Sequence, residues 1–140
     1  MILTLNATPE EVMRAVETLQ EFGREKQVGA KDLFALSLAL EECGTNIISY
    51  GLKRDSQQTF QAGFEYTGTA ITVELRDQGP EFDPTKLDPP AAPSLDEDRP
   101  PGGWGIQLVR KYMDNIVYRR EGEENVLRLT RKLGAREHQE

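Results

Sequence analysis

Two polar side chains stand four residues apart in an otherwise apolar part of the sequence. Glu42 and Asn46 lie in the stretch LEECGTNIISYG, shortly after the apolar run LFALSLAL. In a helix, at about 100° per residue, they would project from one side and be separated by about 6 Å along the axis. A carboxylate and an amide oxygen placed in this way suit Mg²⁺, which takes one or two protein ligands together with phosphate and water. The structural alternative is that the two side chains pair with each other or with a neighbouring loop, and the helix alone favours neither.

A second polar element follows an apolar segment that alternates like a strand. Asp77 ends this segment, and Gly79 comes two residues later, where the chain is expected to turn. A carboxylate at a strand end can accept a hydrogen bond from an exocyclic amine such as that of adenine, and a glycine lets a flat ring approach the backbone. By itself, Asp-x-Gly is most often only a turn.

The third element is glycine-rich. Gly102, Gly103 and Gly105 precede a predicted helix, whose free N–H groups and dipole would attract an anion. The spacing lacks the full Rossmann or Walker pattern, because no Lys-Ser/Thr pair follows. Alone, this segment is a weak sign of phosphate binding.

Composition excludes several classes of protein. The net charge of −7 over 140 residues argues against nonspecific nucleic-acid binding, which needs a basic surface. No apolar run approaches the roughly 18 residues of a membrane span, and the first residues do not resemble a secretory signal. We therefore expect a single domain with neither a membrane segment nor a nucleic-acid partner.

Histidine and cysteine usage narrows the chemistry further. The only histidine is His138, near the C-terminal end, so the sequence offers no Ser-His-Asp triad and no histidine-based zinc site. The only cysteine, Cys43, excludes an internal disulfide and suits a reducing cytoplasm. The predicted location is cytoplasmic.

The expected elements alternate between helices and hairpins. Seven of the eight prolines lie within residues 80–101, which we expect to form a loop or lid rather than a helix or central strand. The remaining segments are a strand at 2–7, a helix at 9–27 capped by Thr8, a helix at 31–50 ended by Gly51, a hairpin at 59–79, a helix after the glycines, and a hairpin at 116–133. This order predicts an α+β fold with helices on one face of a mixed, mostly antiparallel sheet.

Taken together and in this order, the three polar elements resemble the Bergerat-type ATP-binding fold shared by gyrase B, histidine kinases and MutL. The chain has no dimerisation hairpin and most resembles the anti-sigma factor serine/threonine kinases. Members of that family end with a Met-Asp-x-Ile/Val-x-Tyr stretch, here MDNIVY at residues 113–118. The resemblance covers about residues 5–133. It implies a two-layer α/β sandwich, with residues 1–133 forming a histidine-kinase-like ATPase domain and residues 134–140 a flexible C-terminal tail.

The resemblance implies a role for each matching residue, with ATP and Mg²⁺ as ligands. Asn46 would hold Mg²⁺, and Glu42 would be the general base that takes a proton from an attacking serine hydroxyl or water. Asp77 would bind the adenine amine, with Gly79 allowing close approach. Phosphoryl transfer needs mainly positioning and charge neutralisation, so these parts would suffice.

The glycine-rich segment would form part of the nucleotide site. Gly103 and Gly105, with Gly102, would let the lid backbone wrap the phosphates. Arg99 is expected near the γ-phosphate, although it could equally be a solvated loop residue. Trp104 stands where related proteins often have a small, basic or aliphatic residue, and we expect it to cover the core edge. A further departure is Gln107, where many members of the superfamily have another glycine.

Three functions compete at this stage. The first is an ATP- and Mg²⁺-dependent serine protein kinase that phosphorylates a STAS-type antagonist protein and sequesters a sigma factor; homodimers are common in such a family. The second is a nucleotide-binding, partner-switching module without kinase activity. The third, a plain ATPase or chaperone-like switch, is disfavoured because the chain has no transducer domain. Arg14, Arg110 and Arg119 are only scattered candidates for a partner surface.

Overall fold

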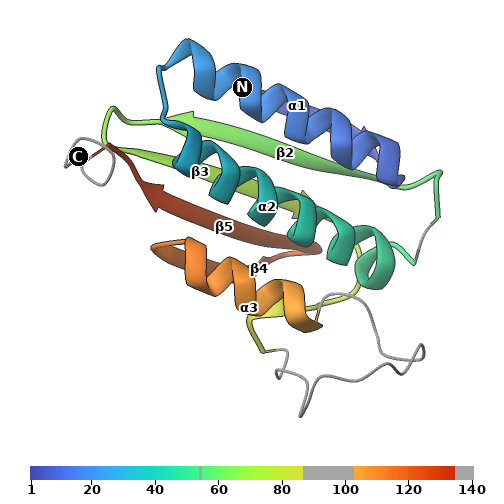
Figure 1. Cartoon of the computed structure of the whole chain (residues 1–140). Coiled ribbons are helices and arrows are strands. Elements are labelled where there is room, and N and C mark those ends of the chain that lie inside the picture. Colours follow the sequence, from blue (N-terminus) through green and yellow to red (C-terminus); the bar gives the residue numbers. More distant parts are fainter. Residues whose placement is uncertain (54, 87–102, 135–140) are drawn as a thin grey trace.

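The computed structural model describes residues 1–53, 55–86 and 103–134. The chain alternates between helices and antiparallel strands, as expected (Figure 1). The elements are β1 (Ile2–Asn6), α1 (Pro9–Glu25), α2 (Ala30–Asn46), the π-helix η1 (Ile47–Gly51), β2 (Thr59–Tyr66), β3 (Ala70–Asp77), the 3₁₀ turn η2 (Pro84–Lys86), α3 (Gly103–Tyr112), β4 (Asn115–Glu121) and β5 (Glu124–Lys132).

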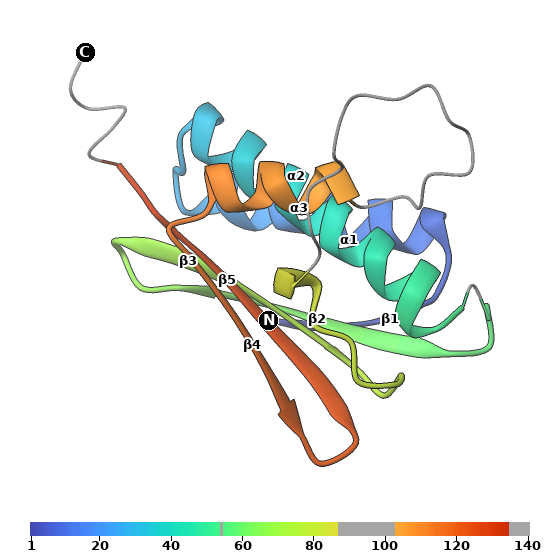
Figure 2. The same ribbon diagram turned by 90° about the horizontal axis from the view of Figure 1, so that it is seen from below.

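The strands form one five-stranded sheet in the order β1-β2-β3-β5-β4, and every neighbouring pair is antiparallel. The three helices lie side by side on one face of this sheet (Figures 1 and 2). The predicted two-layer α+β sandwich is therefore confirmed, with a sheet that is antiparallel throughout its described strands. The core lies between the two layers and includes Leu36 and Leu40 of α2 and Val73 and Leu75 of β3.

The start of α1 follows directly from local chemistry. Thr8 has an extended backbone and its Oγ1 accepts a hydrogen bond from the Glu11 amide at 3.3 Å, which satisfies one of the free N–H groups of the first turn. Pro9 occupies the first helical position, where no backbone donor is needed. Apolar side chains at helical spacing, from Val12 to Leu19, then face the core.

The end of the second helix differs from the prediction. A single helix was expected up to Tyr50, but α2 ends at Asn46 and continues as the wider π-helix η1, in which Leu52 N donates to Ile47 O at 2.8 Å. The wider turn keeps both Ile47 and Ile48 buried and still brings Gly51 beside the end of β3. Short π-helical turns are often found at functional sites.

The expected lid is described only in part. After β3 the chain turns and forms η2, and the remainder of the proline-rich stretch, residues 87–102, lies outside the described residues, as do residues 135–140 of the expected tail. Whether residues 80–101 act as a lid therefore stays a prediction. None of the helices in the described ranges combines the length and the apolar character needed to cross a bilayer.

Candidate functional site

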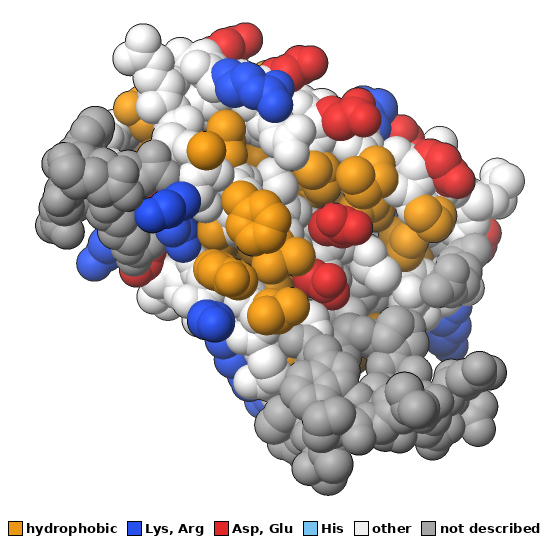
Figure 3. All heavy atoms as spheres, in the orientation of Figure 1, with side chains coloured by type: hydrophobic (Ala, Val, Ile, Leu, Met, Phe, Trp, Pro, Cys, Tyr) orange, Lys and Arg blue, Asp and Glu red, His pale blue; other side chains and the backbone are white. Residues whose placement is uncertain are grey.

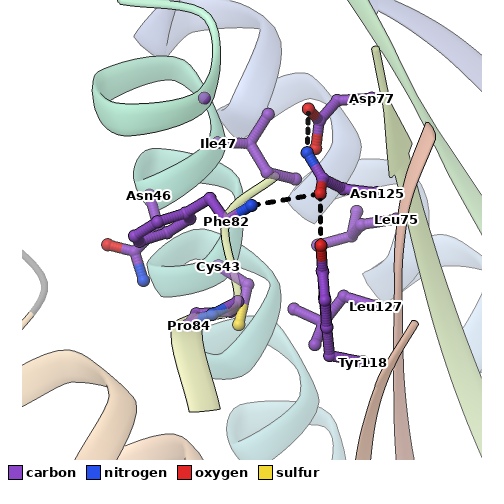
Figure 4. Close-up of a pocket in the computed structure, with 11 residues that line it drawn as sticks. Cys43, Asn46, Ile47, Leu75, Asp77, Phe82, Pro84, Tyr118, Asn125 and Leu127 are labelled. Carbon is purple, nitrogen blue, oxygen red and sulfur yellow. Dashed lines mark hydrogen bonds between the residues drawn. The ribbon is translucent and has the colours of Figure 1, made fainter. Parts of the chain in front are cut away.

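A pocket opens beside the C-terminal end of α2, where η1 faces the end of β3. It encloses about 340 Å³ including its open mouth. The part of this space that the centre of a water-sized molecule can occupy is about 20 Å³. Its lining residues come from five separate parts of the chain and are drawn in Figure 4: Cys43, Asn46, Ile47, Gly51, Leu75, Asp77, Phe82, Pro84, Tyr118, Asn125 and Leu127.

The pocket has apolar walls and polar groups at two separate places. Ile47, Leu75 and Leu127 supply apolar surface, while Asp77 and Asn125 lie together at the sheet (Figure 4). The Asn46 amide points away from the sheet. The chemistry of this lining suits a flat, largely apolar ring with a polar edge, and a charged group attached to such a ring would extend toward Asn46.

Asp77 is held in place by hydrogen bonds to only one of its oxygens. It is 5% exposed, and its Oδ1 accepts from Gly79 N at 2.9 Å and from Asn125 Nδ2 at 3.0 Å. Within the described ranges no donor is recorded on Oδ2. This second oxygen can therefore accept a hydrogen bond from a ligand amine without disturbing the turn.

Gly79 is required by the chain itself. A Cβ at this position would lie 2.5 Å from the Gly51 carbonyl oxygen and 2.9 Å from Asp77 Oδ1, which is closer than real Cβ atoms approach other atoms. The close approach predicted for Gly79 thus has a structural cause, the crossing of η1 over the turn after β3. Its predicted role toward a bound ring stays a prediction.

Asn125 is a central residue of this site that the sequence analysis missed. Its Nδ2 donates to Asp77 Oδ1 and to Pro80 O, and its Oδ1 accepts from Phe82 N at 3.2 Å and from Tyr118 Oη at 2.5 Å. One buried side chain therefore fixes both the orientation of Asp77 and the path of the turn that follows it. The only sequence feature that could have pointed to Asn125 was its position at the end of the expected EGEEN turn.

The strand register explains why Asn125 could not be identified from the sequence. In the β3–β5 ladder Asp77 lies directly opposite Asn125, although 48 positions separate them in the chain. Arg120, from the neighbouring strand β4, adds a hydrogen bond from Nη1 to Gly79 O at 2.8 Å. These contacts depend on the pairing of β5 with both β3 and β4.

Asn46 is buried without a partner. It is 2% exposed, and neither its Nδ2 nor its Oδ1 has a hydrogen-bond partner among the residues that the structure describes. A buried amide left in this state costs about 1–3 kcal/mol, so such groups usually have a ligand, water or strained role. Asn46 therefore does not pair with Glu42, whereas its alternative pairing with the neighbouring loop falls partly on residues 87–102, outside the described residues.

Glu42 lies one turn before Asn46 and is partly buried against α3. Burial, and secondly the negative charge of Glu41, raise the pKa of Glu42 above the ordinary range for glutamate. A Cβ added to Gly105 would collide with the Glu42 carboxylate, whose Cδ would be only 2.7 Å away. The first turn of α3 therefore packs on Glu42, and a side chain at position 105 would require the Glu42 carboxylate to move. The neighbouring Glu41 is exposed.

The glycine segment does not lie entirely before the helix, as the sequence analysis expected. Gly103 and Gly105 already belong to the first turn of α3, and Trp104 lies between them in the helical backbone. The predicted phosphate contacts of these residues stay predictions. Arg99 and Gly102 lie outside the described residues.

The scattered arginines have local roles. Arg14 pairs with Glu11, and Arg119 pairs with Glu121, both as exposed ion pairs that contribute little. Arg110 donates from Nη2 to the Thr85 carbonyl oxygen and so ties α3 to η2. These contacts do not single out any of the three as part of the pocket.

Cys43 is a wall of the pocket rather than a reactive group. Burial, together with the charge of Glu42, raises the pKa of its thiol to about 12. The thiol therefore stays protonated at neutral pH and is a poor nucleophile.

The donor set fits a magnesium ion that brings its own phosphate ligands. No group of three or more His, Cys, Asp or Glu side chains within the described ranges could hold a metal ion by itself. Mg²⁺ commonly takes one or two protein oxygens and completes its shell with phosphates and water. The unpartnered Asn46 amide, near the Glu42 carboxylate, matches that requirement.

Comparison with known proteins yields a family match over most of the chain. The family described as "Histidine kinase-like ATPase domain" matches residues 5–131. The chain is also 31% identical over 129 residues to a Bordetella bronchiseptica protein named serine/threonine-protein kinase BtrW, covering 91% of this chain and 90% of that relative.

Solved structures show the same fold at low sequence identity. The RsbU and RsbW domains of Rv1364c from Mycobacterium tuberculosis superpose with a TM-score of 0.64 at 17% identity, covering 95% of this chain and 32% of that one. The histidine kinase domain of a blue-light activated histidine kinase from Erythrobacter litoralis gives a TM-score of 0.51 at 13% identity, covering 89% of this chain and 60% of that one. The present chain thus spans only part of both solved proteins.

Proposed function

Since the chain belongs to the histidine kinase-like ATPase domain family, we propose that it is an ATP- and Mg²⁺-dependent serine protein kinase. The observation that carries this proposal is the buried, unpartnered amide of Asn46 beside the Glu42 carboxylate, in a pocket whose other end holds Asp77. This arrangement has places for a base, a metal ion and a purine amine.

The pocket would bind the nucleotide through groups that the fold has already oriented. Asp77 Oδ2 would accept a hydrogen bond from the adenine amine, because Oδ1 is engaged by Gly79 and Asn125. The apolar walls would hold the ring, and the Asn46 oxygen would bind Mg²⁺. When bound, Mg²⁺ would supply positive charge to the phosphates in a chain whose own net charge is −7.

Glu42 would act as the general base. The serine hydroxyl oxygen would attack the γ-phosphorus, the bond from that phosphorus to the β–γ bridging oxygen would break, and ADP would leave. The hydroxyl proton would pass to Glu42. Burial, and secondly the charge of Glu41, raise the pKa of Glu42, which makes it a stronger base than an exposed glutamate.

The proposed protein substrate is a STAS-type antagonist, and the proposed second partner is a sigma factor that the chain sequesters in the cytoplasm. A homodimer is the proposed assembly. The relative named as a serine/threonine-protein kinase supports transfer to a protein hydroxyl, and the neighbour titled as containing an RsbW domain supports the comparison with anti-sigma kinases.

The test uses the purified chain, [γ-³²P]ATP with Mg²⁺, and the STAS-domain proteins of the same organism as acceptors. Glu42→Gln should reduce labelling of the acceptor serine by about 10²–10⁴-fold, the usual contribution of a general base. ATP binding by calorimetry should persist. Glu17→Gln, which removes the same charge from an exposed residue of α1, should retain labelling at neutral pH.

The outcomes separate the two leading functions. Wild-type binding of ATP without labelling of any STAS protein would favour the partner-switching module without kinase activity. Labelling that survives Glu42→Gln at the wild-type rate would rule out Glu42 as the base while leaving the kinase activity intact.

A further inference from the structure

A partly exposed apolar strip lies along the seam between α2 and α3. It consists of Phe34 and Leu38 from α2 and Leu108 and Tyr112 from α3, and it is called the α2–α3 strip below. Phe34 is 62% exposed and Leu108 is 40% exposed, whereas Leu38 and Tyr112 are half-buried. Figure 3 shows apolar side chains gathered over these helices. Contiguous exposed apolar surface of this kind usually marks a site of protein association.

The strip leads directly to Glu42. The Phe34 and Tyr112 rings meet edge to face with centroids 6.3 Å apart, and eight residues further along α2 Glu42 contacts Gly105. The two helices therefore run antiparallel along the seam, with Leu38 and Leu108 between these two contacts. At 1.5 Å per residue the strip extends over about 12 Å from the Glu42 carboxylate.

The two ends of the strip carry opposite charge. Glu41 is exposed next to Glu42, at the end near the pocket. Exposed Lys31 lies one turn before Phe34, at the other end, and Lys111 Nζ is 5.8 Å from the centre of the Tyr112 ring. A partner that covers the strip would therefore be best matched by a basic group near Glu41 and an acidic group near the two lysines.

Two other exposed surfaces in the described part of the chain do not have this combination. The sheet face not covered by helices carries ion pairs that neutralise one another, including Arg128 with Glu74 at 2.7 Å and Arg76 with Glu74 at 2.9 Å. The exposed apolar residues Ile2 and Val117 belong to the edge strands β1 and β4. Of these surfaces, only the α2–α3 strip ends at the proposed base.

We propose that the α2–α3 strip is the docking surface for the folded protein that carries the acceptor serine. This inference rests on the proposed kinase function and specifies how its protein substrate is recognised. The partner presents an apolar patch within about 12 Å of its serine, a basic side chain beside the serine and an acidic one at the far end. Docking on the strip places the hydroxyl at the Glu42 carboxylate, while the nucleotide enters from the pocket.

The experiment compares charged substitutions in the strip with one outside it. Phe34→Asp and Leu108→Glu change exposed side chains that do not line the pocket. Met13→Glu is the matched control, because Met13 of α1 is 43% exposed and Leu108 is 40% exposed. The acceptor is the STAS-domain protein that the wild-type chain labels in the assay above.

Each strip variant should raise KM for the acceptor protein at least tenfold, since charged groups would replace central apolar contacts. kcat at saturating acceptor should stay within about twofold, and ATP affinity should be unchanged. Binding of ATP can be followed by the fluorescence of Trp104, the only tryptophan in the sequence. Met13→Glu should leave all three quantities at wild-type values.

Three results would overturn the docking surface and leave the proposed function intact. The first is an unchanged KM in both strip variants, and the second is an equal rise in KM for Met13→Glu. The third is that the wild-type chain sediments as a dimer and both strip variants sediment as monomers. The last result would identify the strip as an interface between two copies of the chain. If the wild-type chain labels no STAS protein, the proposed function itself fails, and the docking proposal fails with it.

Discussion

Each end of α2 carries a buried polar side chain, but only one of the two side chains has hydrogen-bond partners among the described residues. At the N-terminal end Asp32 is 1% exposed; its Oδ1 accepts from Arg131 Nε at 2.6 Å and its Oδ2 accepts from Gly134 N at 3.4 Å. Near the other end Asn46 is 2% exposed and has no hydrogen-bond partner among the residues described. Burial is therefore the same at both ends, but only Asp32 is satisfied.

The comparison separates a structural role from a ligand-binding role. Arg131 also donates from Nη1 to Tyr112 O at 2.6 Å, so the Asp32–Arg131 pair joins the start of α2, the end of β5 and the end of α3. A buried ion pair of this kind is costly to break from one side. Asn46 makes no comparable connection, so its side chain adds cost without structural gain until a ligand binds.

The largest expected effect of a substitution is a loss of stability at the N-terminal end of α2, where Asp32 has its hydrogen-bond partners. Asp32→Ala should lower the free energy of unfolding by about 3–5 kcal/mol, because the Arg131 guanidinium would be left buried without its partner. Urea denaturation measures this loss. ATP affinity of the remaining folded protein, measured well below the melting temperature, should be close to that of the wild type. A loss of ATP binding without loss of stability would contradict the structural role of Asp32.

Asn46→Leu should behave in the opposite way. Replacing an unsatisfied buried amide with an apolar side chain of similar size should raise the free energy of unfolding by about 1 kcal/mol. The factor by which Mg²⁺ increases the affinity for ATP should be about 10–100-fold smaller than in the wild type, which corresponds to about 1.4–2.8 kcal/mol. Calorimetry with and without Mg²⁺ measures the second effect. An unchanged effect of Mg²⁺ would remove Asn46 from the metal site.

Asp77→Asn should have a smaller effect, confined to the nucleotide. The asparagine Oδ1 can keep both hydrogen bonds that Asp77 Oδ1 accepts, so the melting temperature should change little. Its Nδ2 would place a donor against the adenine amine and weaken ATP binding about tenfold. Asp83→Asn is the control, because Asp83 accepts locally from Thr85 in the same turn. If both variants bind ATP equally well, Asp77 does not recognise the base.

The smallest expected effect is a shift in pH dependence. Glu42 acts as a base only when ionised, so phosphotransfer should decline as the pH falls through its raised pKa. Glu41→Gln removes the charge that contributes to this pKa, and it should move the acid limb of the kcat/KM profile to lower pH. Burial remains, so the limb should stay above the range of an exposed glutamate. Glu17→Gln, an equal charge change on an exposed residue of α1, should not move it.

Much of the fold was predictable because its signals are local. Thr8 capped α1 as expected, the alternating segments formed β2, β3, β4 and β5, and the three-helix order was correct. The pattern of Glu42, Asn46, Asp77 and Gly79 also identified residues that the structure brings to one region. Helical period, capping and turn chemistry act over a few residues, so the sequence displays them directly.

The missed features all depend on contacts between distant segments. Asn125 becomes part of the site through its register opposite Asp77, and Gly105 contacts the Glu42 carboxylate because α3 packs on α2. The π-helical turn at the end of α2 likewise reflects packing of η1 over Gly79 rather than a local preference. No spacing within one segment carries this information, because a strand pairing or helix contact is decided by two segments together.

The amino-acid sequence by itself determined the order of helices and strands and the chemical types available for a nucleotide site, since these follow from short-range periodicity and side-chain chemistry. Tertiary structure alone decided which buried polar groups are satisfied. Asp32 pairs with Arg131, which is 99 residues away in the chain, whereas Asn46 lines a pocket and has no hydrogen-bond partner among the described residues. Whether a polar side chain stabilises the fold or awaits a ligand depends on its neighbours in space, and folding is what provides them.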